Sequence, residues 1–279
     1  MKLVQKLGIA YIQTKFKVIT FISKRKAAEK AFELFSTPFA RSKRKDEPKS
    51  AEELNFIVNN LNVKGHRWNY EQQKKALILH GFGSAAYKFE RYVALLVKKG
   101  YEVLAFDAPA HGDSEGKLTN AIEYSEMIKK VIELYGPVDS FIAHSFGGIA
   151  LSLAMENLPH DCNTKIVFIA PATETTSAVD GAFAMLKIKD KAVRAAFDTI
   201  VFEKSGKQTE WFSIRRAVNN IKAQILWIHD EDDDITPLSD ALKVKEDNHN
   251  HIHFVITKGL GHRKIYHDKV VKKTIENFL

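Results

Sequence analysis

The chain has 279 residues, of which 45% are hydrophobic and 27% are charged, a composition typical of a globular protein with one sizeable core. Its net charge of +8 comes from residues 1–50, where 13 Lys and Arg outnumber 4 Asp and Glu, while the rest of the chain is almost neutral, which argues against nucleic acid as the main partner. The single cysteine, Cys162, excludes an internal disulfide and fits a cytoplasmic protein.

Residues 1–50 are predicted to form a basic helical arm and linker. The run AAEKAFELF predicts a helix that stops before Pro38, and RSKRKDEPKS is typical of a charged linker. The apolar run at residues 7–14 is far shorter than the roughly 20 residues of a membrane-spanning helix, and no secretory signal is expected. Two interpretations compete: an arm packed on the body with its lysines in solvent, or a helix in peripheral contact with an anionic membrane.

Short apolar runs alternate with helical patterns from residue 52 onward. The stretch NFIVNNLNVKGHRWNY predicts one or two edge strands with a turn at Lys64-Gly65. A helix is predicted to start after Asn120, with Glu123 three residues on, and to stop at Gly136. The apolar runs lie at residues 76–80, 102–107, 140–145, 165–171, 224–230 and 252–257. This alternation predicts an α/β fold with a mostly parallel central sheet flanked by helices.

The stretch at about 172–222, after the sixth predicted strand, has no strand pattern. It is too long for a bare loop and carries Phe, Met, Leu and Trp at helical spacing. We therefore expect a small helical cap inserted into a domain that spans residues 51–279.

Ser145 lies in the run AHSFGG, between a predicted strand and a predicted helix. A serine on such a sharp turn has an exposed hydroxyl, and the turn requires small residues two positions before and after it. Here these are Ala143 and Gly147. The motif is typical of a catalytic nucleophile, with alanine in place of the usual first glycine.

A serine nucleophile needs a base and an orienting carboxylate. For a serine on a strand-to-helix turn of this kind of fold, the two follow it along the chain in the order acid, then histidine. The acidic run HDEDDDITP (229–237) and the run KGLGHRK (258–264) each follow a predicted strand. His262 lies in the second run, in a short loop flanked by glycine. The order and placement therefore predict a Ser-His-acid triad with Ser145 and His262.

These motifs resemble those of serine hydrolases with the α/β-hydrolase fold, of the esterase and lipase kind, over residues of about 52–279. HGFGS (80–84) resembles the oxyanion loop, and DAPAHGDS (107–114) resembles the Asp-x-Pro-Gly-His-Gly-x-Ser loop, with Ala110 where glycine is usual. AHSFGG resembles the nucleophile elbow, and DDITP with GLGH resembles the acid and base loops.

The resemblance implies catalytic roles for particular residues. The usual spacing before Pro237 selects Asp233 as the acid, with Asp232 second and Glu174 a remote third. The backbone N–H groups of Phe82 and Phe146 are expected to form the oxyanion hole. No metal or organic cofactor is expected. The acidic run at 229–237 lacks the glycine and the distal glutamate of an EF-hand calcium loop. A metal site on His249, His251 and His253 is the less favoured interpretation of these three alternating histidines.

The implied reaction is two-step acyl transfer to Ser145 and then to water. The apolar cap residues and the basic arm favour a small-molecule ester with an apolar or lipid-like acyl group. An acyl thioesterase uses the same triad, and a non-catalytic membrane-associated binding protein with an idle triad is the alternative from another class. The sequence predicts no oligomeric state.

Overall fold

The computed structural model describes residues 3–39, 41–42, 48 and 50–279, and these form two compact units. The helical unit combines the N-terminal residues up to Thr37 with Glu174–Phe212. The α/β unit combines Pro38–Thr173 with Ser213–Leu279. The helices at the N-terminus and those of the predicted cap segment therefore belong to the same unit.

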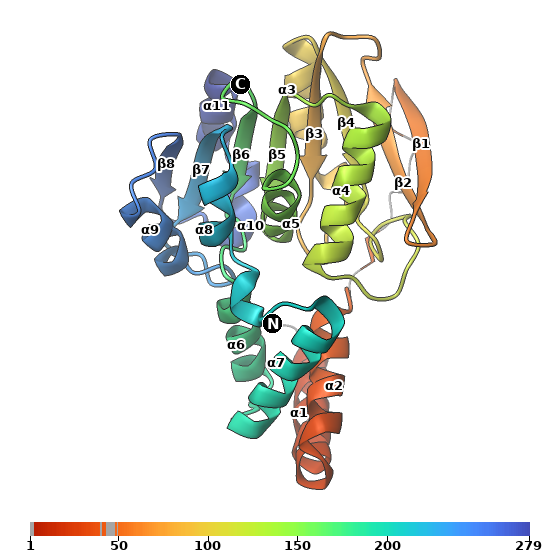
Figure 1. Cartoon of the computed structure of the whole chain (residues 1–279), viewed down its shortest axis with the longest axis vertical. Coiled ribbons are helices and arrows are strands. Elements are labelled where there is room, and N and C mark those ends of the chain that lie inside the picture. Colours follow the sequence, from red (N-terminus) through yellow and green to blue (C-terminus); the bar gives the residue numbers. More distant parts are fainter. Residues whose placement is uncertain (1–2, 40, 43–47, 49) are drawn as a thin grey trace. The chain divides into compact units, whose positions relative to one another are not determined.

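The α/β unit is built on an eight-stranded sheet with the order β1-β2-β4-β3-β5-β6-β7-β8 (Figure 1). The β1–β2 and β2–β4 pairs are antiparallel, and all other neighbours are parallel, which confirms the predicted mostly parallel sheet. The strands are β1 (Ala51–Val58), β2 (Leu61–Trp68), β3 (Lys74–Leu79), β4 (Tyr101–Phe106), β5 (Ser140–His144), β6 (Lys165–Ile169), β7 (Gln224–Asp230) and β8 (Ile252–Thr257).

Helices cover both faces of this sheet. Figure 1 shows α4, α5, α8 and α9 in front of the sheet and α3 and α11 behind it. The predicted start of α4 is confirmed, because the Asn120 side chain accepts the N–H groups of Ile122 and Glu123. The helices are α3 (Glu90–Lys98), α4 (Ala121–Tyr135), α5 (Phe146–Met155), α8 (Ile214–Ala217), α9 (Leu238–Glu246), α10 (Gly261–Lys264) and α11 (Lys269–Phe278), with short 3₁₀ turns η1 (Ala86–Phe89), η3 (Val218–Asn220) and η4 (Ile265–His267).

The turn of the β1–β2 hairpin lies at Asn59-Asn60, so the predicted turn at Lys64-Gly65 is wrong. Both asparagines have positive φ (51° and 61°), as a two-residue hairpin turn requires, and asparagine tolerates this conformation. Gly65 instead lies inside β2, where an added Cβ would come within 2.2 Å of the Phe106 ring. The glycine therefore serves close packing, and not a turn.

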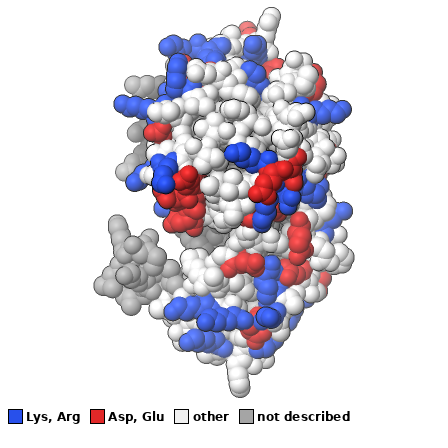
Figure 2. Space-filling model, turned by 90° about the vertical axis from the view of Figure 1, so that its left-hand side faces the viewer, with Lys and Arg blue, Asp and Glu red and all other residues white. Residues whose placement is uncertain are grey.

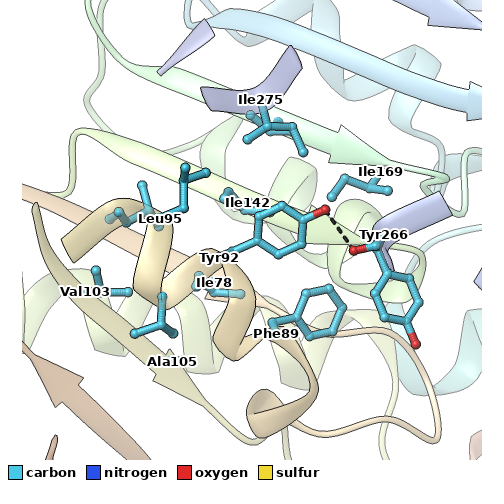
Figure 3. Close-up of a cluster of buried hydrophobic side chains, with 14 of the residues drawn as sticks. Ile78, Phe89, Tyr92, Leu95, Val103, Ala105, Ile142, Ile169, Tyr266 and Ile275 are labelled. Carbon is cyan, nitrogen blue, oxygen red and sulfur yellow. Dashed lines mark hydrogen bonds between the residues drawn. The ribbon is translucent and has the colours of Figure 1, made fainter. Parts of the chain in front are cut away.

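A continuous apolar cluster fills the space between the sheet and the helices α3 and α11 (Figure 3). Phe89 and Tyr92 lie fully buried in it, and the Tyr92 hydroxyl donates a hydrogen bond to the backbone carbonyl of Tyr266 at 2.9 Å. Phe89 and Tyr266 also stack, with ring centroids 5.0 Å apart. Through these contacts the core fixes the segment that follows α10.

The helical unit contains α1 (Leu3–Ile22), α2 (Lys24–Ser36), α6 (Thr175–Met185), α7 (Lys191–Ser205) and the turn η2 (Thr209–Trp211). None of the described helices is long and apolar enough to cross a membrane. Lys24 pairs with Asp190 at 2.5 Å and Arg25 with Glu203 at 2.6 Å, so the start of α2 is tied to both ends of α7. The buried core of this unit comprises Phe16, Ala27, Ala28, Ala31, Val179, Phe183, Leu186, Val193, Phe197 and Ile200.

Candidate active site

Ser145 occupies the sharp turn between β5 and α5, with φ 53° and ψ −119°. This strained conformation holds its side chain at the carboxyl end of the central strand. The turn demands small neighbours: a Cβ on Gly147 would lie 2.8 Å from the carbonyl oxygen of His80, and a Cβ on Gly148 would lie 2.7 Å from Pro171. Ala143 is fully buried, so its methyl group is accommodated in the packed strand.

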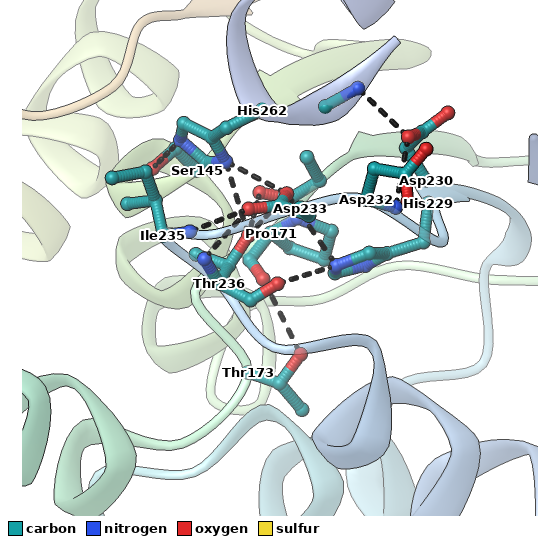
Figure 4. A network of polar contacts seen from close by, with 12 residues as sticks. Ser145, Pro171, Thr173, His229, Asp230, Asp232, Asp233, Ile235, Thr236 and His262 are labelled. Carbon is teal, nitrogen blue, oxygen red and sulfur yellow. Dashed lines mark hydrogen bonds and ion pairs between the residues drawn. The ribbon is translucent and has the colours of Figure 1, made fainter. Parts of the chain in front are cut away.

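His262 links Ser145 to Asp233 in one hydrogen-bonded chain (Figure 4). The Ser145 hydroxyl donates to Nε2 of His262 at 3.0 Å, and Nδ1 of His262 donates to Oδ2 of Asp233 at 2.8 Å. Ser145 follows β5, Asp233 follows β7 and His262 lies in α10, after β8. The structure therefore brings together the three residues that the sequence singled out, at the carboxyl edge of the sheet.

The Asp233 carboxylate is fully enclosed and fully hydrogen-bonded. The backbone N–H groups of Ile235 and Thr236 donate to Oδ1, and the Thr236 hydroxyl donates to Oδ2 at 2.8 Å. Burial opposes ionisation of this carboxyl group, but the hydrogen bonds from His262, Thr236 and Ile235 outweigh it and lower the pKa of Asp233. Asp233 is thus an ionised acceptor that fixes the His262 ring with Nδ1 protonated and Nε2 free to accept a proton.

The other acidic residues of this loop have different partners. Asp232 accepts the N–H of Gly259 at 2.9 Å. Asp230 is buried and accepts the N–H groups of Leu260 and Gly261, which directly precede His262. These two carboxylates therefore hold the backbone of the base loop, a function that the sequence analysis did not assign. In the sequence, only the acidic run at 229–237 pointed to such a function, and spacing alone does not show which of its carboxylates faces the imidazole of His262.

The two backbone N–H groups expected for the oxyanion hole belong to neighbouring residues in the structure. The rings of Phe82 and Phe146 are in edge-to-face contact, with centroids 5.4 Å apart. Among the described residues, neither of their backbone N–H groups donates a hydrogen bond. Gly81 makes the close approach feasible, because a Cβ there would lie 2.9 Å from the Cβ of Ser145. Both N–H groups therefore stay available to a ligand.

Two buried histidines hold the HGFG loop. Nε2 of His111 accepts the N–H of Gly83 at 2.9 Å, and Nε2 of His80 accepts the N–H of Ala108 at 2.9 Å. Burial lowers the pKa of His80 to about 4 and the pKa of His111 to about 3, so both rings are neutral and can accept. These bonds tie the HGFG loop to the neighbouring loop at residues 107–114.

The DAPAHGDS loop lies next to them and carries a strained alanine. Ala110 has φ 65°, a conformation that favours glycine, which explains why glycine is usual there. The side chain of Asp107 accepts the N–H groups of Ala86 and Asp113, so it ties this loop to the start of η1. Burial raises the pKa of the Asp107 carboxyl group.

His144 contacts His262 through its ring and through a hydrogen bond. It is buried, and its Nε2 donates to the backbone carbonyl of His262 at 3.2 Å. Its ring also contacts the rings of Tyr266 and Phe89. Burial lowers the pKa of His144 to about 3, so the ring stays neutral beside the proposed base.

Within the described ranges, no group of three or more His, Cys, Asp or Glu side chains is placed to hold a metal ion.

A family model described as "Serine aminopeptidase, S33" matches residues 70–216, just over half of the chain. The chain belongs to this serine aminopeptidase family. The match covers the HGFG loop and the Ser145 elbow but ends before Asp233 and His262. The resemblance to α/β-hydrolase serine hydrolases is therefore confirmed, while Asp233 and His262 lie outside the matched residues.

Two of the curated relatives of this chain are named as a hydrolase and an esterase. Polyneuridine aldehyde esterase of Rauvolfia serpentina is 31% identical over 107 residues, 37% of this chain and 40% of that protein. The hydrolase YugF of Bacillus subtilis is 31% identical over 106 residues, 36% of this chain and 38% of that protein. The chain thus spans about two fifths of the length of these curated relatives.

Two solved structures share the fold at low identity. The esterase Pf2001 of Pyrococcus furiosus superposes with a TM-score of 0.65 at 20% identity, covering 85% of this chain and 94% of that one. The α/β-hydrolase domain-containing protein 10 of mouse superposes with a TM-score of 0.60 at 15% identity, covering 81% and 95%. The serine aminopeptidase family member described here therefore has the α/β-hydrolase fold.

Proposed function

We propose that this chain is a serine hydrolase that cleaves a carboxylic ester by two-step acyl transfer, with Ser145 as nucleophile, His262 as base and Asp233 as orienting acid. The observation that carries the proposal is the continuous hydrogen-bonded chain from Ser145 through His262 to Asp233. The ester-cleaving enzymes among the relatives and structural neighbours support it.

In the first step Nε2 of His262 takes the hydroxyl proton as Oγ of Ser145 attacks the ester carbonyl carbon. The resulting oxyanion is bound by the N–H groups of Phe82 and Phe146, and losing one such donor typically slows a reaction about 10²–10³-fold. The imidazolium then gives its proton to the departing alcohol. In the second step His262 activates water in the same way, and the carboxylic acid is released.

An apolar acyl group fits the side chains beside the nucleophile. Phe82 and Ile235 are large apolar residues with exposed fractions of 39% and 53%, and the Phe146 ring contacts Phe82. Figure 4 shows Ile235 near Ser145 and His262. Exposed apolar side chains around a hydroxyl nucleophile favour a hydrocarbon chain over a charged group, because only the hydrocarbon gains by leaving water.

The test of the catalytic assignment is labelling by a fluorophosphonate, which reacts with activated serines. We expect the wild type to be labelled, Ser145→Ala to be unlabelled, and His262→Ala to react about 10⁴-fold more slowly or worse. Ser152→Ala is the matched control, since this buried serine in α5 only donates to the Gly148 carbonyl. No labelling of folded wild type would refute the hydrolase and favour a binding protein with an idle triad.

The acyl preference is tested with p-nitrophenyl esters and matching thioesters of increasing chain length. Each methylene buried in an apolar site contributes about 0.8 kcal/mol, so kcat/KM should rise about fourfold per added CH₂ until the site is filled. A profile that is flat or falls with chain length would contradict the apolar substrate. Faster turnover of thioesters than of esters at every chain length would favour a thioesterase.

A further inference from the structure

Helix α1 carries apolar residues on two sides, and the helical unit covers only one of them. Phe16 is buried in the core of this unit, with Ile12 and Ile19 partly buried against it. The side-chain amide of Gln13 donates to the backbone carbonyl of Met185 at 2.9 Å, which fixes this side of α1 on the end of α6. Packing within the helical unit therefore explains the apolar residues on this side of α1, but not those on the other side.

The second side is exposed over several turns. Tyr11 is 70% exposed, Val18 56%, Phe21 91% and Ile22 69%. At 3.6 residues per turn these four positions fall within an arc of about 100°, the width of the apolar stripe of an amphipathic helix. We call these four residues the outer stripe. Single exposed apolar residues are normal on a surface, whereas a contiguous set indicates an interaction site.

Two lysines border the outer stripe. At the same helical spacing, Lys15 falls on the side next to Ile22 and Lys17 on the side next to Phe21. Both are exposed, and neither makes an ion pair with another described residue. This differs from Lys24 at the start of α2, which is paired with Asp190.

Most of the excess positive charge of the chain lies in this unit, and it comes from the N-terminal part, because residues 174–212 are neutral overall. Residues 1–37 and 174–212 contain 14 Lys and Arg against 8 Asp and Glu, while the rest of the chain contains 28 against 26. On the face drawn in Figure 2, several lysine and arginine side chains gather in the lower part of the drawing. The exposed apolar residues therefore lie in the part of the protein that attracts anions.

We propose that the outer stripe of α1 docks the protein on an anionic phospholipid bilayer, with α1 lying in the plane of the surface. Phe21, Ile22 and Val18 enter the boundary between head groups and acyl chains, and the Tyr11 ring lies at the interface with its hydroxyl group in water. Lys15 and Lys17 extend outward along the stripe and meet lipid phosphates. The opposite side of α1 stays packed on the helical unit, so the helix lies on the bilayer without crossing it.

Charge favours a bilayer over a protein partner for this surface. The two lysines stand on opposite borders of the stripe, so a plane of negative charge around an apolar layer satisfies both at once. This inference is independent of the proposed esterase activity, because it uses no residue of the candidate active site.

The experiment is co-sedimentation of the full chain with vesicles of phosphatidylcholine alone and of phosphatidylcholine mixed with phosphatidylglycerol. We expect binding to the mixed vesicles that weakens with added salt. Lys15→Gln with Lys17→Gln should weaken partition about 30-fold, at about 1 kcal/mol for each lysine near an anionic surface. Phe21→Ser with Ile22→Ser should weaken it at least about tenfold, because both side chains lose their apolar burial.

The matched control is Lys269→Gln with Val270→Ser, which removes one exposed lysine and one 73%-exposed apolar residue from α11 in the other unit. It should bind as the wild type does. Circular dichroism melting curves identify any variant that is misfolded. Absence of wild-type binding to the mixed vesicles would overturn the proposal, and so would equal loss in the control. A dimer in analytical ultracentrifugation that Phe21→Ser with Ile22→Ser dissociates, without vesicle binding, would assign the stripe to a second copy instead.

Discussion

Asp230 and Asp233 lie three positions apart and both bind the segment around His262, yet replacing each with asparagine should have opposite consequences. Asparagine keeps one carbonyl oxygen and puts an NH₂ group in place of the second oxygen. Its effect depends on whether the partners of that second oxygen can change from donor to acceptor. We predict that Asp233→Asn mainly removes activity and that Asp230→Asn mainly removes stability.

The partners of Asp233 can change. Oδ2 receives hydrogen bonds from the Thr236 hydroxyl and from Nδ1 of His262, and both groups can accept instead of donate. Asp233→Asn therefore costs little stability, about 1 kcal/mol for a charged acceptor replaced by a neutral one. The imidazole, however, changes to the tautomer with a proton on Nε2, which cannot take the Ser145 proton. Loss of the correct tautomer in this way lowers turnover about 10⁴-fold.

The partners of Asp230 cannot all change. The N–H of Leu260 is shared between Oδ1 at 3.2 Å and Oδ2 at 3.1 Å. A backbone N–H is always a donor, so in the asparagine variant it would lose the Oδ2 part of this bond and lie against the new NH₂ group. The N–H of Gly261 would keep its oxygen but lose the charged acceptor. A charged hydrogen bond contributes about 1.5–3 kcal/mol against about 0.5–1.5 for a neutral one, so Asp230→Asn should lower the free energy of unfolding by about 2–4 kcal/mol.

The assay is urea denaturation of both variants combined with the rate of fluorophosphonate labelling in the folded state. Asp233→Asn should unfold at nearly the wild-type urea concentration and react very slowly. Asp230→Asn should unfold at a lower concentration and, where folded, react within about tenfold of the wild type. If Asp230→Asn abolished labelling without any loss of stability, Asp230 would be the orienting acid and the assignment of Asp233 would be refuted.

Two further predictions concern the buried histidines. His111→Leu leaves the N–H of Gly83 without its acceptor and should displace the loop that carries the Phe82 N–H. Because this N–H acts in the transition state, kcat for an ester should fall about 10- to 100-fold with little change in KM. A change confined to KM would contradict this positioning role. Acid should destabilise the fold, because burial lowers the pKa of His80 to about 4 and those of His111 and His144 to about 3, so below about pH 6.5 only the unfolded chain takes up these protons. Each of these histidines then removes about 1.4 kcal/mol between about pH 7.5 and pH 5.5. His144→Gln should therefore reduce the loss of unfolding free energy between these pH values, measured by urea denaturation, by about 1.4 kcal/mol.

The order of motifs along the chain was enough to predict the fold. Continuous apolar runs such as residues 76–80 and 140–145 alternate with amphipathic helices, and only buried parallel strands joined by helices satisfy that pattern. Because parallel strands end at one edge of a sheet, residues that follow different strands meet there. Ser145 and His262 could therefore be named together although 117 positions separate them.

Local spacing was not enough where two residues compete for one role. The run DEDDD offers several carboxylates within a few residues, and only the folded loop shows that Asp233 faces His262 while Asp232 faces Gly259. The hairpin turn is a similar case. Lys64-Gly65 looked like a turn, yet glycine was required there by the Phe106 ring of a neighbouring strand.

By itself the sequence determined the α/β fold, the place of the serine elbow and the basic character of the N-terminal segment, because these depend on periodicity, small residues and charge close together in the chain. Only the tertiary structure showed that α1 and α2 share a core with residues 174–212, and that Phe21 and Ile22 of α1 are exposed to solvent. Both sides of α1 are apolar in sequence, and which one is buried depends on contacts with helices more than 150 residues away.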